Sequence, residues 1–289
     1  MTAHLLEDRL KDYAIAGALD QENVLQELIQ QYVLASLARA GFFSGEGAVF
    51  HGGTCLRIVH GMNRYSEDLG FFLKRPAPEF AWRRYLGAIL RDAAGEGFQF
   101  SVPDESRQKR AVKKALIRAE SVGRVPPLDL PFERDARRPI KVKLEIDTNP
   151  PAGSDHETRY IAFPLTAALT TQTLGSGFGM KLAALLTRRY TKGRDWYDFL
   201  WYINKRAMPN LELLRNALKQ HSPWAGGEVP ADPAWVVGRL REKIIAVDWG
   251  VVGRDVRRFI PLREQEALGL WDRDFFLHHL GVFSRDLLP

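Results

Sequence analysis

Two adjacent glycines between apolar segments place the strongest constraint on how this chain folds. Residues 49–51 form a short, largely apolar run, Gly52 and Gly53 follow it, and residues 54–59 have apolar side chains at helical spacing. Asp68 then stands at the head of a second apolar run. The pattern predicts a strand, a glycine turn, a short helix and a second strand that begins with a carboxylate.

This order of elements suits the binding of a triphosphate beside a metal ion. Glycines let a phosphate approach the backbone closely, and amide N–H groups at the start of a helix bind an anion. A carboxylate on the next strand would face the same place, where it can hold Mg²⁺. The phosphate-binding candidates are Gly52, Gly53 and Thr54.

Two segments of the chain resemble motifs of one known family. The first segment has matching residues at Gly52, Gly53, Thr54, Arg64, Ser66 and Asp68. The second has matching residues at Lys181, Ala184, Arg188, Arg194, Asp195 and Asp198. In combination they resemble the AbiEii/AbiGii-type nucleotidyltransferase toxins, which are members of the DNA polymerase beta-like superfamily. The resemblance covers residues 50–201.

The resemblance implies an α+β fold, in which helices flank the mixed β-sheet of a nucleotidyltransferase core and a mostly helical C-terminal domain follows. We expect residues 1–165 to form this core with N-terminal helices, and residues 166–289 to form the helical domain that completes the active-site cleft. The family function would be that of a toxin, which transfers nucleotides from an NTP to RNA. The first candidate acceptor is the 3′ end of tRNA, whose modification blocks translation.

The resemblance also implies a cofactor, a partner and roles for single residues. Mg²⁺, or Mn²⁺ in its place, is the expected metal ion, and a cognate antitoxin is the expected protein partner. Asp68 would hold the metal ion, and Lys181 would neutralise triphosphate charge as a compact cation. Asp195 matches a functional Asp of the family, while Arg64 and Ser66 complete the expected NTP site.

Residues 140–147 alternate strictly between apolar and charged side chains, which predicts a strand with one face on the core. The charged face carries Glu145 and Asp147 beside two lysines. It could simply face solvent, but two carboxylates also suit a catalytic cleft. Because a central strand supplies the third carboxylate in this superfamily, Glu145 is the first candidate for a metal ligand and Asp147 the second.

A basic cluster recurs at three- and four-residue steps, which predicts that its members share one face of a helix. They are Arg107, Arg110, Lys114 and Arg118. Such a stripe can follow an RNA phosphate backbone, and an idle solvated face is an equally weighted alternative. In an extended strand, the basic residues of this segment would not all point to one side.

The chain departs from the family motif at Gly70, where the family has a second Asp. The chain could be a natural variant that uses one metal ion, or that uses Glu67 or Asp147 instead. It could also be a degenerate homologue that binds without catalysis, or carry an inactivating substitution. Loss of one metal ligand costs on the order of a thousandfold in rate. We therefore expect this chain to be weakly active or inactive.

Composition narrows the class of protein further. The net charge of +6 favours a polyanionic partner, and the single cysteine excludes a disulfide framework. No apolar run reaches the ~20 residues of a membrane-spanning helix, so we expect a cytoplasmic protein without a membrane partner. Two alternatives to RNA modification stay open. They are nucleotidylation of a protein target and a non-catalytic nucleotide- or RNA-binding homologue.

Overall fold

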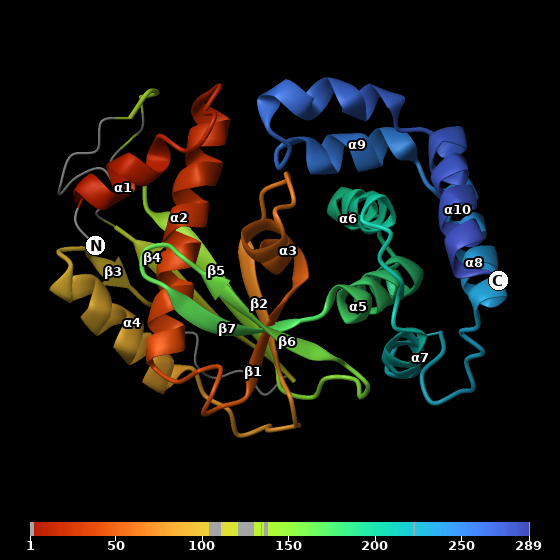
Figure 1. The fold of residues 1–289 in the computed structure, drawn as a ribbon, viewed down its shortest axis with the longest axis horizontal. Helices are drawn as coiled ribbons and strands as arrows, with labels where there is room; N and C mark the ends of the chain where they lie inside the picture. Colours follow the sequence, from red (N-terminus) through yellow and green to blue (C-terminus); the bar gives the residue numbers. More distant parts are fainter. Residues whose placement is uncertain are drawn as a thin grey trace. The chain divides into compact units, whose positions relative to one another are not determined.

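The computed structural model of the chain describes residues 3–103, 111–120, 130–133, 135, 138–221 and 223–288. These residues form two compact units, and Figure 1 labels their helices and strands. Unit 1 comprises Met1–Pro150 and Glu157–Thr171, and unit 2 comprises Pro151–His156 and Gln172–Pro289.

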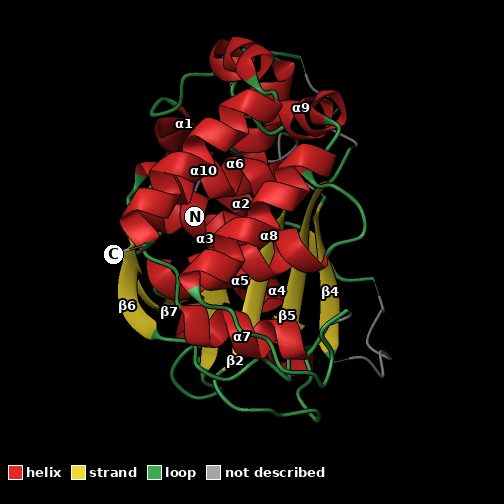
Figure 2. Cartoon of the chain, turned by 90° about the vertical axis from the view of Figure 1, so that its right-hand side faces the viewer, coloured by secondary structure: helices red, strands yellow, loops and turns green. Residues whose placement is uncertain are grey.

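A mixed sheet is the framework of unit 1. The described strands are β1 (Ala48–His51), β2 (Asp68–Leu73), β3 (Phe100–Ser101), β4 (Val112–Ala119), β5 (Ile140–Asp147), β6 (His156–Ile161) and β7 (Ala167–Gln172). They lie side by side in the order β3-β4-β5-β2-β1-β7-β6, and Figure 2 labels β2, β4, β5, β6 and β7 among them. The pairs β2–β5 and β1–β7 are parallel, whereas β1–β2, β3–β4 and β4–β5 are antiparallel. This mixed sheet confirms the expected α+β class.

Helices cover one face of this sheet and form the core with it. The helices of unit 1 are α1 (Ala3–Leu10), α2 (Ala18–Arg39), α3 (Gly52–His60) and α4 (Arg83–Gly95). Val142, Leu144 and Ile146 of β5 are fully buried and join one hydrophobic cluster with apolar residues of α2 and α4. The alternation in residues 140–147 was therefore a correct guide to which face of β5 is buried, and it leaves the charged side chains on the opposite face.

Unit 2 is mostly helical, as expected for the C-terminal part. Its helices are α5 (Leu174–Thr187), α6 (Gly193–Asn204), α7 (Leu211–Lys219), α8 (Pro233–Ala246), α9 (Trp249–Arg257), the 3-10 helix η1 (Leu262–Leu270) and α10 (Arg273–Leu287). Capping side chains set several helix starts, because they accept hydrogen bonds from otherwise unpaired N–H groups. The caps are Thr173, Asn210, Asp232, Asp248 and Asp272. Among the described residues, no helix is both long and apolar enough to cross a membrane.

The predicted basic helix is wrong for the part of it that the structure describes. Residues 112–119 form the strand β4, and its Ala115, Ile117 and Ala119 are buried in the core. The two-residue period of these apolar side chains therefore determines the secondary structure of this segment, and the helical spacing of the charged residues does not. Lys114 and Arg118 lie on the opposite face of the strand. Arg107 and Arg110 lie outside the described residues.

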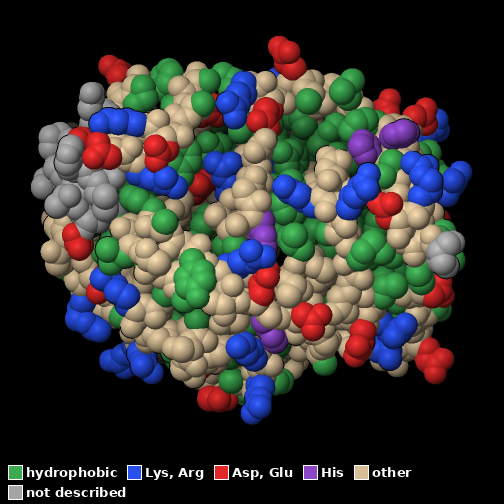
Figure 3. Space-filling view, in the orientation of Figure 1, with side chains coloured by type: hydrophobic (Ala, Val, Ile, Leu, Met, Phe, Trp, Pro, Cys, Tyr) green, Lys and Arg blue, Asp and Glu red, His purple; other side chains and the backbone are tan. Residues whose placement is uncertain are grey.

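The charged side chains of the surface form no single basic field on the face drawn in Figure 3. There, Lys and Arg side chains are interspersed with Asp and Glu. Binding of a nucleic acid to this face would therefore depend on local groups of residues.

Candidate active site

The diglycine turn joins β1 to α3 and brings the first motif together. Gly52 has a φ of +79°, a left-handed backbone conformation that favours glycine. A Cβ placed on Gly53 would lie 2.4 Å from Nη2 of Arg64 and 3.0 Å from Oγ of Ser66. A side chain at position 53 would therefore displace the buried Arg64 guanidinium. The expected NTP-binding residues Gly53, Arg64 and Ser66 are adjacent, as the motif predicts.

Thr54 connects this turn to the candidate metal ligand. Its buried hydroxyl donates a hydrogen bond to the backbone carbonyl of Asp68, and so ties the first turn of α3 to the head of β2. The Thr54 side chain is engaged in positioning Asp68. Its backbone N–H remains the group suited to a phosphate.

Arg64 supplies a buried positive charge against the turn. Only 2% of its surface is exposed, and Nη1 donates a hydrogen bond of 2.9 Å to the carbonyl of Tyr65. The start of α3 carries partial positive charge, and the Arg64 guanidinium adds a full positive charge beside it. Together they would favour a bound anion at this place.

Two glutamines of α2 hold the loop that precedes β2, and the sequence alone did not reveal them. The side-chain amide of Gln30 donates to the carbonyls of Ser66 at 2.8 Å and Glu67 at 2.9 Å. Gln26 donates to the carbonyls of Glu67 at 3.3 Å and Lys141 at 3.0 Å. The sequence signal that could have revealed Gln30 is a polar residue among the apolar positions of a helix. Such a buried amide is nearly always hydrogen-bonded, so it indicates a partner nearby.

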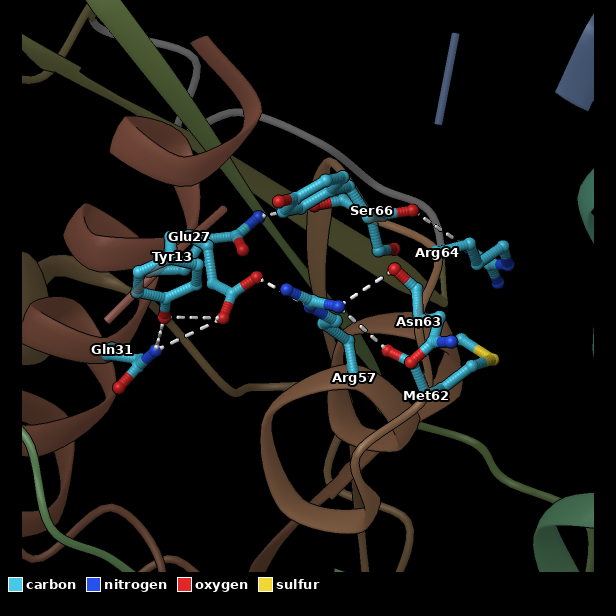
Figure 4. A network of polar contacts seen from close by, with 10 residues as sticks. Tyr13, Glu27, Gln31, Arg57, Met62, Asn63, Arg64 and Ser66 are labelled. Carbon is cyan, nitrogen blue, oxygen red and sulfur yellow. Dashed lines mark hydrogen bonds and ion pairs between the residues drawn. The ribbon is translucent and has the colours of Figure 1, made fainter. Parts of the chain in front are cut away.

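Arg57 fixes the far end of α3 and is drawn in Figure 4. Its Nε lies 2.7 Å from Oε2 of Glu27 on α2, and its Nη1 donates to the carbonyls of Met62 and Asn63. Burial acts to lower the pKa of Arg57, but Glu27 outweighs it and the pKa is raised. Arg57 is therefore charged at any physiological pH. Glu27 also accepts a hydrogen bond of 2.9 Å from the Tyr13 hydroxyl, so α2 and the loop around the motif form one network.

A group of four charged residues lies on the face of the sheet opposite the core. The parallel pairing of β2 with β5 places Asp68 beside Lys143. Nζ of Lys143 lies 2.6 Å from Oε1 of Glu145 and 3.9 Å from Oδ2 of Asp68. Lys114 of β4 reaches the same Glu145 oxygen at 2.9 Å. The two predicted carboxylates Asp68 and Glu145 thus meet at one lysine.

The lysines determine the charge states of this group. Partial burial acts to raise the pKa of Glu145, but hydrogen bonds and charges from Lys143 and Lys114 outweigh it, and the pKa is lowered. Partial burial acts to lower the pKa of Lys143, but Glu145 and Asp68 outweigh it, and the pKa is raised. Glu145 is therefore an anion and Lys143 a cation near neutral pH.

Asp147 does not join this group. In the register of β2 and β5 it pairs with Phe72, four positions beyond the pair formed by Asp68. Four residues of a strand span about 13 Å, too far for Asp68 and Asp147 to share one metal ion. One oxygen of Asp147 accepts a hydrogen bond of 2.9 Å from the N–H of Asn149 at the end of β5.

The second motif forms a buried ion-pair group in unit 2. Nζ of Lys181 on α5 lies 2.7 Å from Oδ1 of Asp195 and 2.7 Å from Oδ2 of Asp198, both on α6. Arg188 reaches Oδ2 of Asp195 at 2.6 Å. Asp195 therefore orients two cations, and two carboxylates hold Lys181 in place. The expected meeting of Lys181 with a triphosphate at the diglycine turn stays a prediction.

A comparison with models of protein families identifies the chain. Residues 35–278 match the family described as nucleotidyl transferase AbiEii toxin, of type IV toxin–antitoxin systems. The chain belongs to this family. The match covers most of the sequence and confirms the resemblance carried by the two motifs. The protein is accordingly a nucleotidyltransferase toxin of a type IV toxin–antitoxin system.

Solved structures support the fold of this AbiEii protein. MenT4, a nucleotidyltransferase toxin from Mycobacterium tuberculosis H37Rv, is 18% identical with a TM-score of 0.52, and the match covers 98% of this chain and 99% of that one. JHP933 from Helicobacter pylori is 17% identical with a TM-score of 0.51, covering 94% and 92%. At these identities the likeness shows the fold alone. A comparison with curated protein sequences gave no match.

Two carboxylates of this AbiEii protein, Asp68 and Glu145, are the candidates to hold a Mg²⁺ ion. No three His, Cys, Asp or Glu side chains within the described ranges form a group that could hold a metal ion. Asp68 and Glu145 still offer two neighbouring carboxylates. Mg²⁺ usually takes one or two protein carboxylates and completes its shell with substrate phosphates and water. A Mg²⁺ ion held by these two carboxylates would therefore need the nucleotide to complete its ligands.

Gly70 is not required by the backbone. It pairs with His51 across β1 and β2, and its φ lies outside the left-handed region. A Cβ at this position would lie 3.4 Å from the backbone oxygen and 3.5 Å from Nε2 of His51, which are ordinary contact distances. The backbone of this AbiEii protein therefore leaves room for a Cβ at position 70.

Proposed function

We propose that this toxin transfers nucleotides from an NTP to an RNA acceptor in a Mg²⁺-dependent reaction. The first candidate acceptor is the 3′ end of tRNA, whose modification would block translation in the cytoplasm. One observation carries the proposal. The diglycine turn, Asp68 and Glu145 are linked into one unit by the hydrogen bond of Thr54 and by Lys143.

The first step is the binding of the triphosphate. The backbone N–H groups of Gly53 and Thr54 at the start of α3 would bind phosphate oxygens, and the buried guanidinium of Arg64 would favour their negative charge. Asp68 would hold Mg²⁺, which neutralises triphosphate charge and orients the reacting phosphate. Lys181, kept in place by Asp195, would add a positive charge to the triphosphate site.

Glu145 would act on the acceptor side. Because its pKa is lowered by Lys143 and Lys114, it is an anion that accepts hydrogen bonds but binds protons poorly. A general base works best when its pKa lies near the working pH. Glu145 is therefore suited to orient the attacking hydroxyl group of the acceptor, or to share the metal ion, rather than to remove a proton early.

The RNA acceptor is supported by charge and by family. The net charge is +6, and RNA is held chiefly through its phosphates. Of the predicted RNA-binding residues, Lys114 pairs with Glu145 in this structure, so Arg118 is the better candidate on β4. A cognate antitoxin protein is the partner that the type IV system suggests.

The test is to incubate the protein with Mg²⁺ and each labelled NTP, first with total RNA and then with total protein. We expect weak label in RNA from this chain and stronger label from Gly70→Asp, concentrated in both cases in the tRNA fraction. Label found only in protein would refute the RNA acceptor and leave the transferase activity standing. No label in either, together with binding of Mg·NTP by an intact fold, would indicate a non-catalytic homologue.

A further inference from the structure

The loop between α5 and α6 combines an exposed aromatic ring with several cations. It contains Arg188, Arg189, Tyr190 and Lys192, and Arg194 follows in the first turn of α6. Tyr190 is 67% exposed, although aromatic side chains usually gain from burial. The guanidinium of Arg188 lies 6.0 Å from the centre of the Tyr190 ring, which leaves most of the ring surface available to a ligand.

This loop is anchored at both ends. Arg188 bonds to Asp195 at 2.6 Å, and Nζ of Lys243 donates to the carbonyl of Arg188 at 3.2 Å. The N–H of Gly193 donates to Oδ2 of Asp255 at 2.7 Å, and a Cβ at Gly193 would lie 2.3 Å from the backbone oxygen of Val252. The loop thus presents Tyr190 from a fixed frame, which lowers the entropy cost of binding.

Several cations lie around Lys192. Burial, Arg194, Arg188 and Lys181 all lower the pKa of Lys192, and only Asp195 acts against them. Asp195 pairs with both Lys181 and Arg188, and Asp198 also pairs with Lys181. The crowded positive charges are therefore unfavourable to one another, and an anion bound here would relieve their repulsion.

A second ring extends the cationic surface beyond the loop. The guanidinium carbons of Arg194 and Arg258 lie 4.1 Å and 4.6 Å from the centre of the buried Phe259 ring. The stacking keeps these two planar cations close together on one part of unit 2. Flat, fixed guanidinium groups suit phosphate oxygens better than mobile lysines do.

We infer that this loop binds the single-stranded end of the RNA acceptor. A base would stack on Tyr190, while Lys192 and Arg194 would contact the adjacent phosphates. An aromatic platform beside cations is the usual means of binding single-stranded nucleic acid without sequence preference. The inference rests on the proposed function, because it names the contact by which that acceptor is held.

The test measures binding without catalysis. A 5′-fluorescent single-stranded RNA of about 12 nucleotides is titrated with protein in the absence of NTP, and its anisotropy is followed. Tyr190→Ala is expected to raise Kd about 5- to 150-fold, the range for loss of one stacked base. Tyr190→Phe is expected to bind like the original chain. The matched control is Tyr160→Ala on β6, where the tyrosine is 70% exposed, and it is expected to change nothing.

Salt dependence separates stacking from charge. Each phosphate contact contributes about 0.7 to the slope of log affinity against log salt for a single strand. Lys192→Met is expected to reduce this slope by about that amount, whereas Tyr190→Ala leaves the slope unchanged. Equal affinity of Tyr190→Ala and the original chain, or equal losses for Tyr190→Ala and Tyr160→Ala, would overturn the inference.

A parallel labelling assay keeps the two proposals apart. If the original chain labels RNA and Tyr190→Ala labels it with the same KM, the loop inference falls and the proposed function stands. If the chain labels protein only, the RNA acceptor falls. In that case the loop inference stands only if Tyr190→Ala still weakens RNA binding.

Discussion

Introducing with Gly70→Asp the carboxylate that the sequence resemblance implies at this position is the sharpest test of the proposed site. Position 70 lies two residues from Asp68 on β2, so both side chains project from the same face. It also pairs with Glu145 across β2 and β5. The new carboxylate would stand between the two carboxylates already present and would complete a set of three.

The expected gain in transfer rate equals the loss in rate that the missing metal ligand should cause. A third carboxylate is expected to raise the rate of nucleotide transfer on the order of a thousandfold, which corresponds to about 4 kcal/mol of transition-state stabilisation. The substitution should fit, because the nearest atoms to its Cβ, those of His51, are at 3.4 Å and 3.5 Å. Activity should therefore rise without loss of the fold.

The same substitution has a cost when no metal ion is bound. Two carboxylates about 6.6 Å apart on one strand face repel by roughly 1–3 kcal/mol at an effective dielectric constant of 20 to 40. The ammonium of Lys143 offsets part of this repulsion. Gly70→Asp should thus be slightly less stable than the original chain without metal ion, and should gain more stability on addition of Mg·NTP.

The assay compares initial rates of transfer of labelled NTP to tRNA, with thermal unfolding measured with and without Mg·NTP. Gly70→Asn is the matched control, since it has the same shape without the charge. Robust and equal activity of the original chain and Gly70→Asp would refute the reasoning. Equal rescue by Gly70→Asn would show that a metal-binding charge is not the cause.

Further predictions concern the parts of the site that hold it together. Gly53→Ala should lower the free energy of unfolding by about 1–3 kcal/mol in a denaturant titration, since its Cβ would lie 2.4 Å from a buried guanidinium. The control is Gly95→Ala, whose Cβ meets nothing within 4 Å and which should not lower this free energy. Lys143→Met should raise the pKa of Glu145, so the acidic limb of the pH–rate profile should move to higher pH; an unmoved limb would contradict the role of that lysine. Asp68→Asn should abolish the dependence of NTP binding on Mg²⁺ in calorimetry; a variant whose binding heats still depend on Mg²⁺ as in the original chain would argue against Asp68 as ligand.

The pH dependence of stability follows from the same ion pairs. The pKa of Glu145 is lowered in the folded chain, so its contribution to stability is present above its unfolded pKa and is lost as the pH falls through the folded value. The pKa of Lys143 is raised, so its contribution is present below its unfolded pKa and is lost as the pH rises through the folded value. Both contributions are therefore complete near neutral pH.

The sequence predicted those parts of the molecule whose signals are local. The glycine turn, the strand that Asp68 begins and the alternation of β5 each depend on a few adjacent residues. The segment containing Lys114 was mispredicted because basic residues at three- and four-residue steps occur in helices and strands alike. The small and apolar Ala115 and Ile117 decided the outcome by packing into the core.

Other features depended on strand register, which one sequence does not reveal. Lys143 is 75 positions from Asp68 along the chain, and only the pairing of β2 with β5 brings them together. The glutamines of α2 were missed for a related reason. In the sequence, Gln30 looks like any other polar residue of a helix, because the loop carbonyls that it binds are known only from the structure.

Lys143 joins two carboxylates that would otherwise stand side by side without a cation before any metal ion binds. Adjacent carboxylates without a cation repel each other. Here Lys143 contacts both Asp68 and Glu145, and Lys114 adds a second positive charge at Glu145, so the four charges balance. A site balanced in this way already presents anionic ligands to Mg²⁺, but the ion must compete with an ammonium for them. A third carboxylate would shift that competition toward the metal ion, which is why position 70 governs activity in this proposal.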